Sequence, residues 1–134
     1  MGVPMALQPP LLLLGRALIA LLFVHEGFVK LGTLAGAQRY AALAGLPGWS
    51  IYPAIALEVG CGVMVLLGLG TRIGAILLAL FSVVTAFLFH TKFGEVNQVL
   101  HFEKNLAIAG GLLALAVVGP GRWALETYGK RRGA

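Results

Sequence analysis

Four long apolar stretches, separated by short polar segments, constrain the fold of this chain more than any other feature. The stretch from Ile73 to Phe89 has no charged residue, and each of the other three has at most three. About 20 residues cross the hydrocarbon core of a bilayer, and a helix satisfies all of its backbone hydrogen bonds internally. We therefore predict an all-α, integral membrane four-helix bundle, with helices at about 11–31, 53–69, 73–90 and 100–119.

The composition agrees with a membrane environment. Of the 134 residues, 59% are hydrophobic and 11% are charged, whereas soluble domains carry about 25% charged residues. Four spans with short loops use the whole length, so we predict one transmembrane domain, residues 1–134, with the lipid bilayer as its main partner. Anionic lipid headgroups and the positive-inside rule account for the net charge of +5. We therefore predict no nucleic-acid partner.

The distribution of basic residues favours one orientation in the membrane. With four spans, both chain ends and the turn near residue 71 lie on the same side. That side holds six of the 10 Lys and Arg residues: Arg16, Arg72, Arg122, Lys130, Arg131 and Arg132. Because cytoplasmic segments carry an excess of Lys and Arg, we predict a multi-pass plasma-membrane protein with both termini in the cytoplasm. Arg16 and Lys30, near opposite ends of the first helix, are expected to extend toward opposite surfaces.

Most ionisable residues of the predicted spans gather near the outer surface, in a layer to which all four helices contribute. The polar residues of this layer are His25, Glu26, Lys30, Glu58, His90, His101, Lys104 and Asn105. A charge within the hydrocarbon costs roughly 2.5–3.5 kcal/mol, so several together persist only if they pair, face water or bind something. Glu26 and Lys30 are spaced i, i+4 and can pair. Glu58 needs a partner from another helix, and Lys30 and Lys104 are the candidates.

Two interpretations of this polar layer stay open. In the first, the ion pairs only hold the helices together, and His90 and His101 are interfacial residues half in water. In the second, the layer surrounds an outward-facing pocket in which His25 and Glu58 act as catalytic groups, passing protons to a reducible lipid such as a quinone. The remaining residues then bind this cofactor: Glu26, Lys30, His90, His101, Lys104 and Asn105.

The spacing of these residues does not favour a metal site. No His-x-x-x-His or Glu-x-x-His pattern occurs in the sequence, so we predict no bound metal ion. A haem held by two of the histidines is the less favoured alternative. The single cysteine, Cys61, lies in an apolar stretch and has no partner within the chain, which excludes an internal disulfide and dithiol redox chemistry.

A series of short motifs runs from Arg16 to about Leu115. In order, they are Arg16-x6-Phe23, Gly27-Phe28-x-Lys30-Leu31, Glu58-x-Gly60, Gly68-x-Gly70-x-Arg72, His90 and Lys104-Asn105-x5-Gly111-Leu112-Leu113. With these motifs the chain resembles the DoxX family of small four-helix membrane proteins. The resemblance implies a bacterial or archaeal plasma-membrane protein. The family takes its name from a subunit of thiosulfate:quinone oxidoreductase, and related members are linked to oxidative-stress complexes with soluble redox enzymes.

Three functions are compatible with these observations. The leading hypothesis is a membrane subunit of a redox system, which holds a quinone or a similar lipid-soluble carrier in the outward-facing pocket and works with a soluble redox enzyme. The first alternative is a non-enzymatic scaffold or assembly factor that anchors a soluble enzyme. The second alternative is a carrier for a small apolar or weakly acidic compound, for which four helices give little room unless a homo-oligomer forms. The sequence leaves the substrate and the oligomeric state open.

Overall fold

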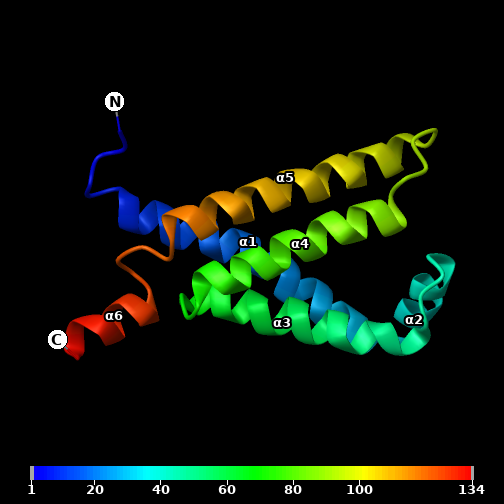
Figure 1. The fold of residues 1–134 in the computed structure, drawn as a ribbon, viewed down its shortest axis with the longest axis horizontal. Helices are drawn as coiled ribbons and strands as arrows, with labels where there is room; N and C mark the ends of the chain where they lie inside the picture. Colours follow the sequence, from blue (N-terminus) through cyan, green and yellow to red (C-terminus); the bar gives the residue numbers. More distant parts are fainter. Residues whose placement is uncertain (1, 134) are drawn as a thin grey trace.

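The computed structural model describes residues 2–133 and contains four helices that are long and apolar enough to cross a membrane. These are α1 (Gln8–Gly32), α3 (Ile51–Leu67), α4 (Thr71–Phe89) and α5 (Val96–Val118) (Figure 1). The prediction of an all-α membrane bundle is confirmed, with each helix close to its predicted range. The short helices are α2 (Leu34–Leu43), the 3₁₀ turn η1 (Gly48–Ser50) and α6 (Leu125–Arg132).

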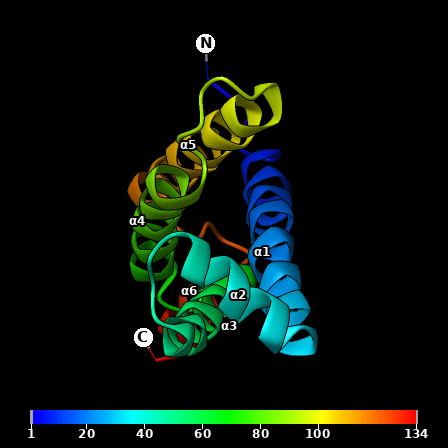
Figure 2. The same ribbon diagram turned by 90° about the vertical axis from the view of Figure 1, so that its right-hand side faces the viewer.

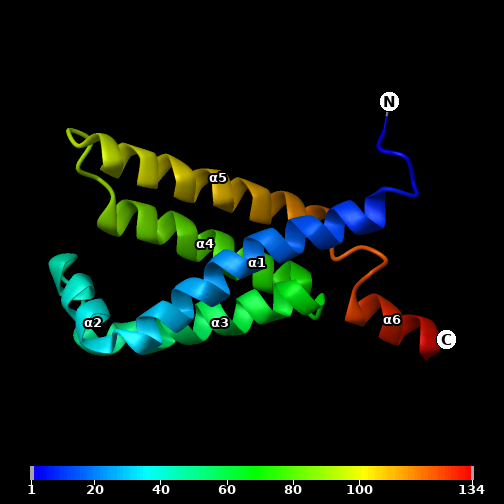
Figure 3. The same cartoon turned by 180° about the vertical axis from the view of Figure 1, so that it is seen from behind.

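The four long helices form two close pairs, which are joined through α3 and α4. α1 packs mainly against α3, α5 packs mainly against α4, and α3 contacts α4. Seen along the bundle, α4 and α5 lie on one side and α1 on the other (Figure 2). α1 runs obliquely across the back of the bundle and meets α5 only over a small area (Figure 3). The first and last long helices therefore do not close the bundle along their full lengths.

Small residues bring the α1–α3 pair close together. Gly27 of α1 lies against Val59, and Gly62 of α3 lies against Val24, so the two glycines have reciprocal positions in the seam. A Cβ atom on Gly62 would stand 2.9 Å from a methyl group of Val24. Van der Waals packing is a main force between helices in lipid, and it favours such small residues at the contacts. The seam fixes which face of α1 turns toward α3.

The turn between α3 and α4 is tight and depends on two glycines. Gly68 (φ 73°) ends α3 and Gly70 (φ 58°) precedes α4, and both adopt the left-handed conformation that side chains with a Cβ disfavour. Only residues 68–70 separate the two helices. The short turn makes α3 and α4 antiparallel neighbours.

The C-terminal segment folds back onto this turn and buries Arg16. The Arg16 side chain is 1% exposed, and its Nη2 donates a hydrogen bond to the carbonyl of Trp123. The Glu126 carboxylate accepts a hydrogen bond of 2.7 Å from the backbone N–H of Gly70. The backbone N–H of Glu126 donates to the carbonyl of Gly68. The expectation that Arg16 extends to the membrane surface is therefore wrong, because the returning chain supplies a carbonyl acceptor inside the bundle.

Arg72, at the start of α4, caps the C-terminal end of α5. Its Nη1 donates to the carbonyls of Ala116 and Val117, at 2.6 Å for Val117. The last carbonyls of a helix have no partner within the helix, and a cation there also interacts favourably with the helix dipole. Polar contacts thus tie α4, α5 and α6 together at the end of the bundle where both chain ends lie (Figure 1).

Candidate functional site

A cavity of about 780 Å³ lies in the opposite half of the bundle, beside α2. Its walls come from the second half of α1, from α2, from the start of α3, from the end of α4 and from the start of α5. The cavity forms there because α1 stays with α3 and α5 stays with α4, so that the two pairs are not packed against each other at this end. Much of the wall is apolar, including Leu22, Phe23, Leu57, Phe81, Leu88 and Ile108.

The residues predicted to form a polar layer converge on this cavity, with one exception. Those that line it are Glu26, Lys30, Glu58, His90, His101, Lys104 and Asn105. They lie near the C-terminal end of α1, in the first half of α3, directly after α4 and in the first half of α5, which all meet at one end of the bundle. The convergence follows from the antiparallel order of the helices, which brings the end of α1 beside the start of α3.

The exception is His25, which does not line the cavity and has an exposed side chain. Successive residues of an α-helix are rotated by about 100° around its axis. Glu26 and Lys30, four residues apart, face the cavity, so the residue before Glu26 points to a different side of α1. The expected pairing of His25 with Glu58 around one pocket is therefore not found in the structure.

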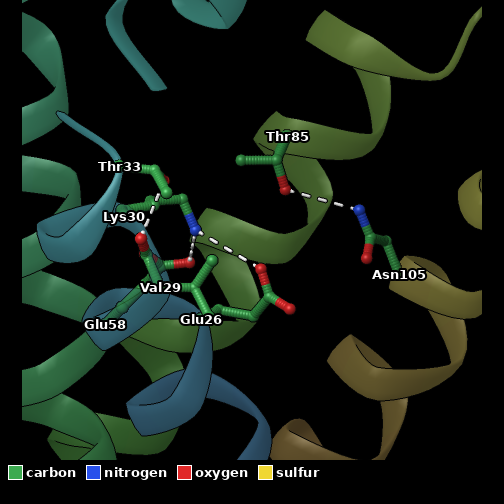
Figure 4. Close-up of polar contacts among 7 residues, drawn as sticks. All are labelled: Glu26, Val29, Lys30, Thr33, Glu58, Thr85 and Asn105. Atoms are coloured by element: carbon green, nitrogen blue, oxygen red, sulfur yellow. Dashed lines mark hydrogen bonds and ion pairs between the residues drawn. The ribbon is translucent and has the colours of Figure 1, made fainter. Parts of the chain in front are cut away.

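Lys30 is the centre of the charged group on one wall of the cavity. Its amine donates a hydrogen bond of 2.9 Å to Oε1 of Glu58 and lies 3.8 Å from Oε2 of Glu26. Figure 4 shows the amine between the two carboxylates. Of the two partners that the sequence offered for Glu58, the structure selects Lys30. Lys30 also lies in the last turn of α1, where a positive charge is favourable.

Glu58 is the most deeply buried charged residue of the cavity wall, with 4% of its surface exposed. Its Oε1 accepts from Lys30, but its Oε2 is buried and has no hydrogen-bond partner among the described residues. A buried polar atom without a partner costs free energy comparable to a lost hydrogen bond. The Glu58 carboxylate is therefore held by Lys30 through one oxygen only, and its second oxygen lies without a partner inside the described part of the protein.

The facing wall, from α4 and α5, offers uncharged polar groups. Thr85 and Asn105 lie across from the charged group (Figure 4), and the Asn105 amide donates a long hydrogen bond of 3.5 Å to the Thr85 hydroxyl. Ser82, one turn away from Thr85, is buried and also lines the cavity. A molecule in the cavity would therefore meet charges on one side and neutral hydrogen-bonding groups on the other.

His90 and His101 lie together at the end of this wall. Their rings stack with centroids 5.1 Å apart, and the Nδ1 atom of His90 is 3.0 Å from the Oε1 atom of Gln98. Lys104, one turn further along α5 from His101, is exposed and also borders the cavity. Within residues 2–133, no three side chains of His, Cys, Asp or Glu are grouped closely enough to hold a metal ion.

α2 covers one side of the cavity, a role that its sequence did not indicate. Ala37, Tyr40 and Ala41 of α2 line the cavity, and the Tyr40 ring stacks on the Phe89 ring at the end of α4, with centroids 4.8 Å apart. Burial raises the pKa of the Tyr40 hydroxyl above its ordinary value, so this group stays neutral at physiological pH. The signal in the sequence is weak, because α2 is short and rich in alanine.

Comparison with known proteins places the chain in a family. The family model described as DoxX matches residues 11–91, which span α1 to α4. The inner membrane protein YqjF of Escherichia coli K12 is 42% identical over 114 residues, covering 85% of this chain and 88% of that protein. The inner membrane protein YphA of the same organism is 32% identical over 128 residues, covering 90% of this chain and 91% of that protein.

A third relative comes from another bacterium. A membrane protein of Mycobacterium tuberculosis is 30% identical over 132 residues, covering 88% of this chain and 80% of that protein. No solved structure matches the chain. The matches extend over nearly the whole length, and the names of all three relatives describe membrane proteins. This chain is therefore a membrane protein that belongs to the DoxX family.

Proposed function

We propose that this protein is the membrane subunit of a redox system and holds a quinone, or a similar lipid-soluble carrier, in the cavity beside α2. The observation that carries the proposal is a cavity of about 780 Å³ whose wall combines apolar side chains with the Lys30–Glu58 pair. Sites for small molecules usually have volumes of about 300–1,000 Å³ and a mainly apolar wall with a few polar groups. The cavity has both properties.

The polar groups of the wall suit the ring of a quinone. Its carbonyl oxygens accept hydrogen bonds, and Lys30, Lys104 and Asn105 carry N–H donors at the cavity. His90, His101 and Glu58 are the groups that can bind or release protons there, as the two-electron chemistry of a quinone requires. His25 has no part in this proposal, because its side chain lies outside the cavity.

We further propose that the protein lies in the plasma membrane with both termini in the cytoplasm, so that the cavity faces outward. The inner-membrane names of two relatives and the excess of Lys and Arg at the end with both termini support this orientation. A reporter enzyme that folds only in the cytoplasm should be active when fused after residue 134 and inactive when inserted near residue 93. The reverse pattern would contradict the orientation.

The side chains that line the cavity can supply protons but not electrons. A partner therefore has to exchange electrons with the carrier. We assign this role to a soluble redox enzyme. Such an enzyme would reach the carrier from the outer face, beside His90 and His101, if the proposed orientation is correct.

Carrier binding can be tested with a variant in which a larger side chain occupies the cavity. Ala37 of α2 lines the cavity and is half-buried, whereas Ala42 of the same helix is exposed and does not line it. We expect Ala37→Phe to lower the amount of quinone that co-purifies in mild detergent by about tenfold or more, because overpacking typically costs 1–3 kcal/mol and 1.4 kcal/mol is tenfold. Ala42→Phe, the matched control, should leave it unchanged.

The measurement is lipid extraction from the purified protein, followed by chromatographic quantification of quinones per mole of protein. Wild-type protein without any quinone, together with membranes that lack quinone-dependent activity, would contradict the proposal. A quinone-free protein that still captures a soluble enzyme in stoichiometric amounts would instead support the scaffold alternative.

A further inference from the structure

The cavity is closed by helix contacts on three sides, and its fourth side lies between α1 and α5. α1 packs against α3, α3 against α4 and α4 against α5, whereas α1 and α5 meet only over a small area. One of their contacts joins Ile19 of α1 to Gly111 of α5, where an added Cβ atom would stand 3.7 Å from a methyl group of Ile19. One turn further toward α2, Leu22 and Ile108 already line the cavity. The two helices therefore separate from this turn onward and leave the fourth side open.

α2 covers the end of the cavity that lies toward the membrane surface. The Tyr40 ring of α2 lines the cavity and stacks on the Phe89 ring at the end of α4. The Gln38 amide of the same helix donates a hydrogen bond of 3.4 Å to the Tyr52 hydroxyl at the start of α3. These contacts hold α2 across both helix pairs. A molecule that arrives from water has to pass this helix, whereas a molecule that arrives between α1 and α5 does not.

The open side extends deep into the bilayer. Leu22 lies nearly three turns before the end of α1 at Gly32, and Ile108 lies just over three turns after the start of α5 at Val96. These positions are about 15 Å and about 18 Å from the respective helix ends, at 1.5 Å per residue. Since the hydrocarbon core is about 30 Å thick, the opening reaches approximately the bilayer centre. It therefore faces the lipid chains of one half of the bilayer.

The two edges of the opening change from polar to apolar with depth. Nearer to α2, Glu26 lies on the α1 edge and Lys104 on the α5 edge, and both side chains are exposed. Nearer to the bilayer centre, the corresponding residues are Leu22 and Ile108. An amphiphile in this half of the bilayer has its head toward the surface and its chain toward the centre. Such a molecule matches the opening without having to turn over.

We propose that the ligand of the cavity is an amphiphile with a hydrocarbon chain, and that it enters sideways from the bilayer between α1 and α5. This inference rests on the proposed function, because it assigns the entry route and the chemical form of the same ligand. A quinone with a long apolar tail belongs to this class, whereas a small water-soluble quinone does not. In the proposed orientation, the ligand comes from the outer half of the plasma membrane.

The route can be tested with two thiol reagents that differ in solubility. Thr85 is half-buried, lines the cavity and is close to cysteine in size, so Thr85→Cys places a thiol inside the cavity. The full-length protein also carries Cys61→Ala, which removes the single native thiol, and is held in phosphatidylcholine nanodiscs. Decyl methanethiosulfonate reaches the thiol from the bilayer, and sulfonatoethyl methanethiosulfonate, which has a fixed negative charge, reaches it from water.

The measured quantity is the rate with the decyl reagent divided by the rate with the sulfonate reagent. Asn97→Cys, an exposed position of α5 outside the cavity wall, provides the reference. We expect this ratio to be at least about tenfold higher for Thr85→Cys than for Asn97→Cys, because a fixed charge is strongly disfavoured in the hydrocarbon that the opening faces.

A blocked opening gives an independent result on the same thiol. Ile108→Trp places a large ring between the two edges, so it should slow the decyl reagent at Thr85→Cys by about tenfold, a change in barrier comparable to the cost of overpacking. Leu106→Trp is the matched control, because Leu106 is an exposed residue of the same helix that does not line the cavity. It should leave the rate unchanged.

The possible failures are distinguishable. Equal ratios at the two thiol positions, or equal slowing by Ile108→Trp and Leu106→Trp, would overturn the lateral route and leave the proposed function standing. Absence of quinone from the purified protein would contradict the proposed function, while the reagent rates would still report the route. The comparison of the two reagents requires neither tryptophan variant, so it decides the question even if Ile108→Trp does not fold.

Discussion

Lys30→Met is expected to destabilise the bundle by about 3–5 kcal/mol, the usual effect of removing one partner from a buried ion pair. Lys30 is the cation that contacts both Glu58, at 2.9 Å, and Glu26, at 3.8 Å. Without it, the buried carboxylate of Glu58 has no counter-charge, and the carboxylate of Glu26 adds repulsion. Methionine keeps the length of the side chain, so the loss reports on charge more than on packing. The measurement is the free energy of unfolding of the purified protein in detergent, with circular dichroism as the signal that monitors unfolding.

A second substitution separates this charge effect from a general defect. The double variant Lys30→Met/Glu58→Leu has no buried carboxylate. Replacement of a whole buried ion pair by apolar residues is often neutral or stabilising. We expect the double variant to recover most of the lost stability. Glu58→Leu alone should cost less than Lys30→Met alone, because Lys30 is 24% exposed and keeps Glu26 as a neighbour. A double variant as unstable as Lys30→Met would show that the pair is not the cause.

Gly68→Ala is expected to destabilise the protein by about 2–5 kcal/mol. Gly68 has φ 73°, and a residue with a Cβ pays about 1–2 kcal/mol in the left-handed region. In addition, its Cβ would collide with the Arg16 guanidinium and with Ala124, and overpacking of this kind typically costs about 1–3 kcal/mol. Both neighbours hold the C-terminal segment against the α3–α4 turn, so we also expect α6 to detach, which limited proteolysis near residue 125 would detect.

Gly45→Ala is the matched control for backbone strain. Gly45 has φ 74°, nearly the same conformation, but no atom lies within 4 Å of the position that its Cβ would occupy. Its cost should be that of the conformation alone, about 1–2 kcal/mol, and α6 should stay protected from proteases. If both variants lose the same free energy of unfolding, the close contact of Gly68 with Arg16 and Ala124 does not contribute to the cost of Gly68→Ala.

The membrane bundle could be predicted from the sequence because it depends on local properties. Whether a segment such as 73–89 enters a bilayer is decided mainly by its own length and apolar character, and both can be read directly from the sequence. Helix ends are equally local, since a glycine such as Gly70 indicates the turn between α3 and α4 by its residue type alone. The depth of Glu58, Lys30 and His90 along their helices followed from the same bounds.

The direction in which each side chain points was harder to predict, and two residues illustrate why. His25 and Glu26 are adjacent and equally deep, yet Glu26 lines the cavity and His25 does not. The position of Arg16 near the start of α1 suggested a side chain that extends to the headgroups. It is buried instead, and it donates to the carbonyl of Trp123, which is far away in the sequence. Both outcomes depend on which helix faces are in contact, and a lipid environment that accepts any apolar face does not select among them.

Two properties could be read from the amino-acid order without any neighbouring helix: the chain crosses a membrane with four helices, and its polar groups gather at one end. Each of these properties results from the free energy of a segment in its solvent, which needs no knowledge of neighbouring helices. The packing of the helices was needed to show that Lys30 bridges Glu26 and Glu58, that Oε2 of Glu58 remains without a donor among the described residues, and that α1 and α5 separate beside a cavity. These depend on close packing of small residues such as Gly27 and Gly62, which rotates α1 on α3 and so selects the side chains that meet.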